Sequence, residues 1–272
     1  MKGLKFLTAG VPIKAGNKGY EAGFKVLDEM GLDGLELEFV RGVRISDKSR
    51  EAVSSSNKVI TAHAPFYVNL NAREEEKVEA SVQRIIETAE VANELGGYSI
   101  TYHAAYYLGM EAELVYKQVV EQTKIIIDAL NKSGNKIWIR PETTGKATQW
   151  GDLEEIVRLS KEFEHVLPCV DFSHLHARYN GLVNTYDEFC QIFETIGNEL
   201  GQVALDNFHA HIAGIEYGAK GEKKHLNLEE SDFNYKDLLK AFKSFNVQGA
   251  VICESPNIED DAKLLKDFYL SL

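Results

Sequence analysis

Side chains that can bind a divalent metal ion recur along this chain, each at the end of a short apolar run. One such run, at residues 168–176, leads into Asp171, and His174 follows three residues later. Because aspartate is disfavoured inside a strand, we expect Asp171 at the carboxyl end of a buried strand and His174 in the turn beyond it. The two residue types suit a metal ion, but the pair alone is weak evidence and needs further ligands.

Five more runs finish in the same way. They end at His63, His103, Glu142, His211 and Glu254, so six consecutive predicted strands each finish on a residue that can ligate a metal. Imidazole and carboxylate groups together suit zinc or manganese, and a carboxylate can bridge two ions. Burial of an unpaired carboxylate is costly, so we interpret Glu142, Asp171 and Glu254 as ligands rather than structural residues.

Of the four remaining histidines, one is a further candidate ligand and three are not. His225 follows the seventh predicted strand and is placed at the same rim. His209 and His211 share one face of that strand, and His211 is preferred because it lies nearer the strand's end. We expect His176 beside the site or at the surface, and His165 at the opposite end of the fold.

Strand patterns that alternate with helical patterns must position these residues. We expect eight strands, at residues 4–8, 34–39, 58–63, 98–103, 137–142, a run ending at 171, 207–211 and 249–254. Helical spacing covers residues 18–30, 74–95, 111–131, 187–200, 235–245 and the segment from 258, and Asp152 caps one more helix. Eight such units in one domain of 272 residues predict a (β/α)8 TIM barrel, whose strand ends converge on one mouth. An open doubly wound sheet is the alternative, but no Gly-x-Gly-x-x-Gly follows the first strand.

The composition is that of an ordinary globular protein, with 44% hydrophobic and 26% charged residues. We find no membrane span, no apolar signal-peptide core and no sign of an obligate protein partner. Three scattered cysteines fit a reducing cytoplasm, and Cys169 is expected to be a small apolar filler because no general base accompanies it. A net charge of -12 argues against a non-specific nucleic-acid coat, but not against a nuclease whose metal ions supply positive charge.

At these residues the sequence resembles the endonuclease IV family of apurinic/apyrimidinic (AP) endonucleases, within the xylose-isomerase-like barrels. The matching segments, in the family's order, are 62–70, 102–103, 141–145, 171–174, 211–213, 225 and 254–255. The resemblance implies a trinuclear zinc site that incises DNA 5′ to abasic sites. By position, one zinc would be held by His63, His103 and Glu142, and a second by Glu142, Asp171, His211 and Glu254. His174 and His225 would hold a third.

The third set departs from the family at one position. The family places an aspartate two residues before the last histidine, where this chain has Lys223, and a protonated lysine cannot ligate zinc. Either Glu222 replaces that aspartate, or the third ion is weak or absent and Lys223 offers a fixed positive charge to the phosphate. We therefore expect two zinc ions, leave the third open, keep manganese as the alternative metal, and take Glu142, Glu254 and Lys223 as candidate catalytic residues.

The resemblance also implies contacts with DNA. The family inserts side chains into the duplex so that the abasic nucleotide flips out, and Phe66 and Tyr67, just after His63, occupy that region. Arg41 and Arg44 follow the second strand, where the family has a minor-groove loop. The alternatives are rim packing for the two aromatic residues and a solvated basic loop, with Lys48 and Arg50, for the arginines.

A second function fits the same barrel. Four of the candidate ligands, Glu142, Asp171, His211 and Glu254, resemble the single-metal site of sugar isomerases and epimerases, where two glutamates move protons beside a carbonyl. The acidic charge and Lys223 favour this class, whereas His63, His103 and His225 exceed what one metal needs. A non-catalytic metal-binding regulator has no positive feature in the sequence.

Overall fold

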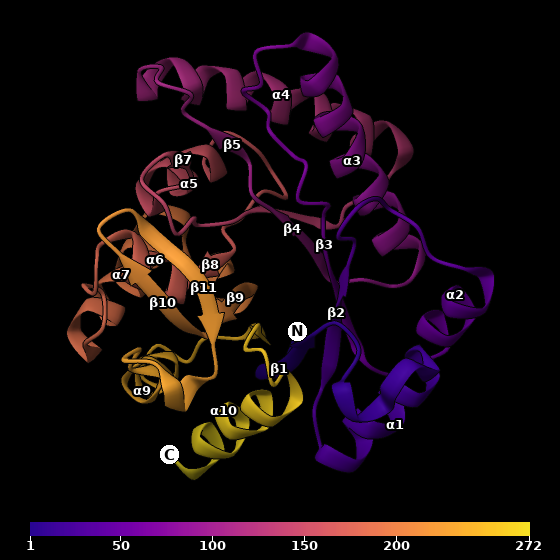
Figure 1. Ribbon diagram of the computed structural model, residues 1–272. Helices are drawn as coiled ribbons and strands as arrows, with labels where there is room; N and C mark the ends of the chain where they lie inside the picture. The colour runs from indigo at the N-terminus through magenta and orange to yellow at the C-terminus, as the bar shows by residue number, and fades with distance from the viewer.

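Eight parallel strands form the wall of a barrel in the computed structural model, which describes residues 1–272 (Figure 1). They are β1 (Leu4–Ala9), β2 (Gly34–Glu38), β3 (Val59–His63), β4 (Ser99–Tyr102), β6 (Trp138–Pro141), β8 (Val170–Asp171), β9 (Phe208–Ile212) and β12 (Gly249–Cys253). The order is β6-β4-β3-β2-β1-β12-β9-β8. The barrel closes between its two ends, because Cys169 N donates to Pro141 O at 3.0 Å. The predicted (β/α)8 barrel is confirmed, and the open sheet is excluded.

Helices surround this wall, as Figure 1 shows. The predicted ones are confirmed as α1 (Tyr20–Met30), α3 (Glu75–Glu94), α4 (Ala112–Ser133), α5 (Leu153–Ser160), α7 (Tyr186–Leu200), α9 (Tyr235–Ser244) and α10 (Glu259–Ser271). Asp152 caps α5 as expected, in a capping box with Glu155. None of the helices combines the length and the apolar character that a membrane crossing requires.

Several short elements were not predicted. They are the 3-10 helices η1 (Ile13–Lys18) and η2 (Leu228–Glu230), the helices α2 (Asp47–Ser54), α6 (Phe172–Arg178) and α8 (Gln202–Asp206), and two antiparallel pairs, β5 (Ala105–Tyr106) with β7 (Gln149–Trp150) and β10 (Gly214–Gly218) with β11 (Gly221–Leu226). Two expectations are thereby corrected. Lys48 and Arg50 belong to α2 rather than to a loop, and Arg50 pairs with Glu94 at 2.6 Å. His174 lies in the first turn of α6 rather than in an open turn.

The interior of the barrel is largely polar, apart from a small apolar cluster of Leu7, Ala250 and Ile252, unlike the layer between strands and helices. That layer holds an apolar core of 60 buried residues. Inside the wall lie buried Glu36, Thr61, Arg140, His209 and His211. Neighbouring strands approach so closely that some positions leave no space for a side chain. A Cβ at Gly34, the first residue of β2, would lie 1.8 Å from Val59 O of the neighbouring β3.

Candidate metal centre

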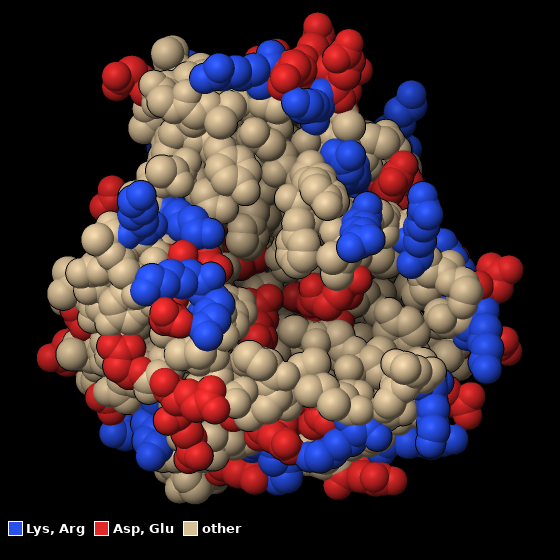
Figure 2. All heavy atoms as spheres, in the orientation of Figure 1, with Lys and Arg blue, Asp and Glu red and all other residues tan.

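The residues at the ends of the strands meet at one mouth of the barrel. A cavity of about 330 Å³ opens there, lined by Ala9, Glu38, His63, Phe66, His103, His174, Glu222, His225 and Glu254. Figure 2 shows acidic side chains at the bottom of a hollow in this face and basic side chains around it. No Lys or Arg lines the cavity, so its three carboxylates lack a fixed positive charge among the residues that line it.

The first group of donors comes from β3, β4 and β6. His63 Nε2 lies 3.2 Å from Glu142 Oε2, and His103 Nε2 lies 3.1 Å from Glu142 Oε1. One ligand atom from each of the three residues lies within 4.8 Å of the others. Glu142 and His63 are buried, while His103 is partly exposed toward the mouth.

The second group shares Glu142 with the first. Its other members are Asp171, His211 and Glu254, again with one donor atom each within 4.8 Å of the rest. His211 Nδ1 lies 3.2 Å from Glu254 Oε1 and 3.5 Å from Glu142 Oε1. The strand register places Asp171 on β8 directly beside His211 on β9.

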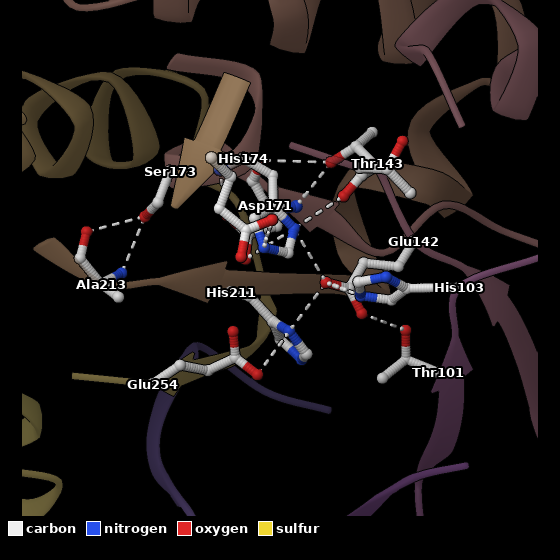
Figure 3. A network of polar contacts seen from close by, with 12 residues as sticks. Thr101, His103, Glu142, Thr143, Asp171, Ser173, His174, His211, Ala213 and Glu254 are labelled. Atoms are coloured by element: carbon white, nitrogen blue, oxygen red, sulfur yellow. Dashed lines mark hydrogen bonds and ion pairs between the residues drawn. The ribbon is translucent and has the colours of Figure 1, made fainter. Parts of the chain in front are cut away.

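The third group shares Asp171 with the second. It adds His174 and His225, and its donor atoms also lie within 4.8 Å of one another. His174 Nδ1 lies 3.2 Å from Asp171 Oδ2 and 3.2 Å from Glu142 Oε1. The structure thus brings all eight candidate ligands together in three overlapping groups, as Figure 3 shows for most of them.

Outer hydrogen bonds orient three of the imidazoles. The Nδ1 atoms of His63, His174 and His225 lie 2.7, 3.0 and 3.2 Å from the backbone carbonyl oxygens of Ala64, Thr143 and Glu254. A carbonyl only accepts, so each ring donates through Nδ1, and Nε2 is the nitrogen that can bind a metal ion once it has lost its proton. Hydrogen bonds of this kind behind the ring fix the tautomer of metal-ligating histidines.

Helix α6 is attached firmly to the barrel around Asp171. Asp171 Oδ1 accepts from His174 N at 2.6 Å and so caps the helix. Thr143 Oγ1 accepts from Asp171 N at 2.8 Å, and Ser173 Oγ accepts from Ala213 N at 2.8 Å (Figure 3). These contacts hold the donors on rigid elements rather than on loops.

Three donor atoms of the site are buried and unpaired, which tests whether a metal fits. Glu142 Oε1, Asp171 Oδ2 and His211 Nδ1 make no hydrogen bond, although they lie close to other donors of the groups. Buried polar atoms without partners are rare in native structures. Nitrogen and oxygen donors aimed at a common space fit a divalent ion such as zinc.

The charges of the site depend on one another. Burial opposes ionisation of Glu142, but neighbouring His103 and His211 outweigh it and hold its pKa well below the ordinary value. Burial lowers the pKa of His63, but its hydrogen bond and charge interaction with Glu142 raise it to about 10. Without a metal, protons on the histidines therefore balance the carboxylates, and cations can replace them.

The register of the hairpin β10–β11 determines whether Lys223 lies in the site. Its register shifts between Glu216 and Tyr217, so that Tyr217 pairs with Glu222 and Glu216 with Lys224, which leaves Lys223 in a bulge. Lys223 is exposed, and its Nζ lies 3.2 Å from Glu216 Oε1. The structure therefore does not bring Lys223 into the site, contrary to its expected catalytic role.

Glu222 points into the site instead. It lines the cavity, and its Oε2 lies 3.7 Å from His174 Nε2. Because the bulge adds a residue, Glu222 and His225 face the same cavity although they are three positions apart. Of the two alternatives left by the sequence, the geometry favours Glu222 as the carboxylate near the third group.

The candidate DNA contacts lie around the mouth. Phe66 and Tyr67 are 61% and 64% exposed, in the turn after β3, and the Phe66 ring contacts His63 edge-on. Arg84 Nη1 donates to Tyr67 O at 3.1 Å and so supports this turn. Arg41 and Arg44 lie between β2 and α2, and both are exposed. No contact with the donor groups involves either arginine.

Two glutamates of β2 join the site although the sequence did not single them out. Glu36 is fully buried inside the barrel, and Glu38 lines the cavity beside His63 in the strand register. The strict alternation of residues 34–39 contained the signal, because neither face of a barrel strand meets solvent. Glutamates at alternate positions of such a strand must then point into the barrel.

Two further histidines and one cysteine do not belong to the three donor groups. His176 is buried rather than on the surface, and its Nε2 lies 3.1 Å from Asp232 Oδ1, away from the donor groups. His165 lies next to Trp138, at the opposite end of the barrel as expected. Cys169 is fully buried inside the barrel, and burial raises the pKa of its thiol to about 12. A neutral thiol there fits the expected filler.

A closed parallel barrel with a histidine and carboxylate cluster at its mouth defines the class of this protein. Residues 24–269 match the family described as xylose isomerase-like TIM barrel, and the chain belongs to that family. It is 45% identical to an uncharacterized protein of Methanocaldococcus jannaschii over 99% of this chain and 98% of that one. A probable endonuclease 4 of Bacillus subtilis is 23% identical over 77% of this chain and 70% of its own length.

Solved structures include both enzyme classes that the sequence suggested. A D-tagatose 3-epimerase-like protein superposes with a TM-score of 0.75 at 19% identity, covering 98% of this chain and 97% of the other. Endonuclease IV from Thermus thermophilus superposes with a TM-score of 0.72 at 17% identity, covering 99% and 100%. At such identities the likeness concerns the fold.

Proposed function

We propose that this protein is a metal-dependent phosphodiesterase that binds two or three divalent ions, zinc foremost, and cleaves DNA 5′ to abasic sites. One observation carries the proposal: two donor groups, His63–His103–Glu142 and Asp171–His174–His225, flank the four-residue group and share a carboxylate with it. A reaction that uses one metal does not need the flanking groups. Adjacent ions suit in-line displacement at a phosphodiester.

The chain's own residues have distinct tasks in this proposal. Bound ions would supply Lewis-acid chemistry and neutralise phosphate charge. Glu142 and Asp171 each belong to two groups, so each would help to hold the ions of both. Phe66 and Tyr67 offer aromatic faces at the mouth, on which exposed bases or sugar edges can pack. Arg41 and Arg44 offer charges that contact DNA phosphates without reading sequence.

Incision of a duplex with a single abasic site tests this function. We expect zinc- or manganese-dependent nicking 5′ to the site and none of an undamaged duplex. His103→Ala should reduce nicking by at least about 100-fold, since it removes one donor of the first group. Glu29→Gln, at an exposed position on α1, is the matched control and should behave as wild type. Absence of nicking by the metal-loaded wild-type protein would contradict the proposal.

A sugar epimerase remains the second candidate, because one observation favours it. Glu142, Asp171, His211 and Glu254 form a complete four-donor group by themselves, with two glutamates available for proton transfer. This candidate predicts epimerisation of ketoses with manganese and activity that survives His103→Ala. The same variant therefore separates the two functions, since it should abolish nicking but spare a one-metal reaction.

A further inference from the structure

Glu36 lies directly below the donor groups, inside the barrel. Its side chain is fully buried, and no Lys or Arg pairs with it. Its two oxygens instead contact two imidazoles of β9: Oε1 lies 3.0 Å from His211 Nε2, and Oε2 lies 3.2 Å from His209 Nε2. The two Nε2 atoms also lie 3.2 Å from each other, and neither oxygen of Glu36 makes a hydrogen bond of good geometry. A buried carboxylate needs donors, and a proton on each Nε2 would meet that need.

His209 is itself held from the other side. Ser99 Oγ lies 2.8 Å from His209 Nδ1. With Nε2 protonated toward Glu36, Nδ1 of His209 accepts from the serine hydroxyl. Ser99, His209, Glu36 and His211 therefore form one buried chain of polar contacts. The chain ends at His211 Nδ1, the unpaired atom that faces Glu142 and Glu254.

His211 differs in this respect from the other oriented imidazoles of the site. His63, His174 and His225 each donate through Nδ1 to a backbone carbonyl and present Nε2. His211 has the opposite orientation: it presents Nδ1 and directs Nε2 to a carboxylate. A carboxylate behind a ligating imidazole fixes its tautomer and raises its basicity more than a carbonyl does.

We propose that Glu36 is the positioning residue for His211: it holds a proton on Nε2 and thereby keeps Nδ1 directed at the ion of the four-residue group. His209 and Ser99 in turn fix the carboxylate. This inference rests on the proposed metal centre, but the contact between Glu36 and His211 is present without a metal. Its test can therefore separate a wrong role for Glu36 from a wrong function for the protein.

Two-dimensional ¹H–¹⁵N spectra of the metal-free protein give the direct readout. In wild type we expect a downfield, slowly exchanging His211 Nε2–H resonance that persists when zinc is added, because only Nδ1 meets the ion. Glu36→Gln should move this resonance upfield, and zinc affinity measured by chelator competition should fall by about 10- to 100-fold. Glu36→Asp keeps the charge but shortens the side chain, and should weaken affinity as well.

Glu29→Gln, at an exposed position on α1, is the matched control. It neutralises one carboxylate outside the barrel and leaves the Glu36–His211 contact, so we expect the resonance to remain and zinc affinity to stay within about threefold of wild type. The proposal is overturned if wild type lacks the Nε2–H resonance, or if Glu36→Gln keeps both the resonance and the zinc affinity. Should wild type show the resonance but bind no zinc, the proposed function fails, and the positioning of the His211 proton stands.

Discussion

At the scale of residues, the candidate metal ligands could be predicted from the sequence, whereas the groups that hydrogen-bond to them could not. His63, Glu142 and Glu254 were predictable because a polar residue at the end of an apolar run has few structural explanations. Their partners, such as the Ala64 carbonyl and the Thr101 hydroxyl, carry no sequence signal. Any residue supplies a carbonyl, so only the folded backbone shows which one lies behind an imidazole.

Glu38 provides a pH-dependent prediction. Burial raises its pKa to about 8, which the charge of His63 offsets only in part. Between the ordinary pKa of a glutamate and pH 8, the folded protein holds a proton that the unfolded chain has released. The free energy of unfolding therefore falls as pH rises through this window. In metal-free protein, Glu38→Gln should match wild type near pH 4 and become progressively more stable than wild type up to pH 8.

Denaturant unfolding in the presence of a chelator measures this effect across pH. Glu29→Gln, on the exposed face of α1, controls for the loss of one negative charge and should show no such trend. A stability difference between Glu38→Gln and wild type that stays constant from pH 4 to 8 would show that Glu38 is not held protonated.

Asp171 has two roles that one substitution can separate. Its Oδ1 caps α6, whereas its Oδ2 is unpaired and faces the site. Asparagine also caps helices well, so Asp171→Asn should unfold within about 1 kcal/mol of wild type without metal but lose metal affinity strongly. Asp171→Ala should lose the cap as well, at a further cost of about 1 kcal/mol. If Asp171→Asn binds metal as wild type does, Asp171 is only a cap.

At the scale of elements, the long ones followed from periodicity, whereas the short ones did not. Strands such as β3 and helices such as α3 and α4 repeat their pattern over enough residues to be recognised. Helix α6 has seven residues, and six of them are buried, so its amphipathic pattern is absent. The β10–β11 hairpin is polar on β11 and is held by contacts such as Glu222 N with Gly145 O at 2.9 Å.

The bulge in that hairpin yields a paired prediction. Glu222→Gln should weaken binding of the most weakly held ion, because it removes the carboxylate nearest His174. Lys223→Ala should change metal binding little, since this side chain is exposed and pairs with Glu216. Isothermal titration with zinc resolves the separate sites. An unchanged weakest site in Glu222→Gln, or a large loss in Lys223→Ala, would show that the hairpin register has been misinterpreted.

At the scale of the whole molecule, the formal net charge is negative, whereas basic side chains lie beside the mouth of the barrel. The chain carries a formal net charge of -12, and acidic side chains lie at the bottom of the mouth, yet basic side chains lie on two sides of it, to the left and upper right in Figure 2. The barrel was predictable from eight repeated strand–helix units. The order in which the donors meet was not, because it depends on the closure of β8 against β6. A polyanion that approaches this face would meet the basic side chains before the candidate metal ligands beneath them.

DNA binding should therefore depend on salt through the rim. The double variant Arg41→Ala/Arg44→Ala should bind abasic duplex more weakly and reduce the slope of log affinity against log salt by up to about 2, roughly one for each lost phosphate contact. The matched double variant Lys117→Ala/Lys132→Ala removes two exposed charges from α4, on the outside of the barrel, and should keep the wild-type slope. Equal slopes in all three proteins would exclude the two arginines as phosphate contacts.

The number of metal ions per chain tests the central claim most directly. Elemental analysis of the purified protein, after zinc loading and removal of excess metal, should give two to three zinc ions per chain. The double variant His63→Ala/His103→Ala should retain at least one fewer, because it removes two donors of the first group. One ion or less per wild-type chain would contradict the account, since the flanking groups would then bind no metal.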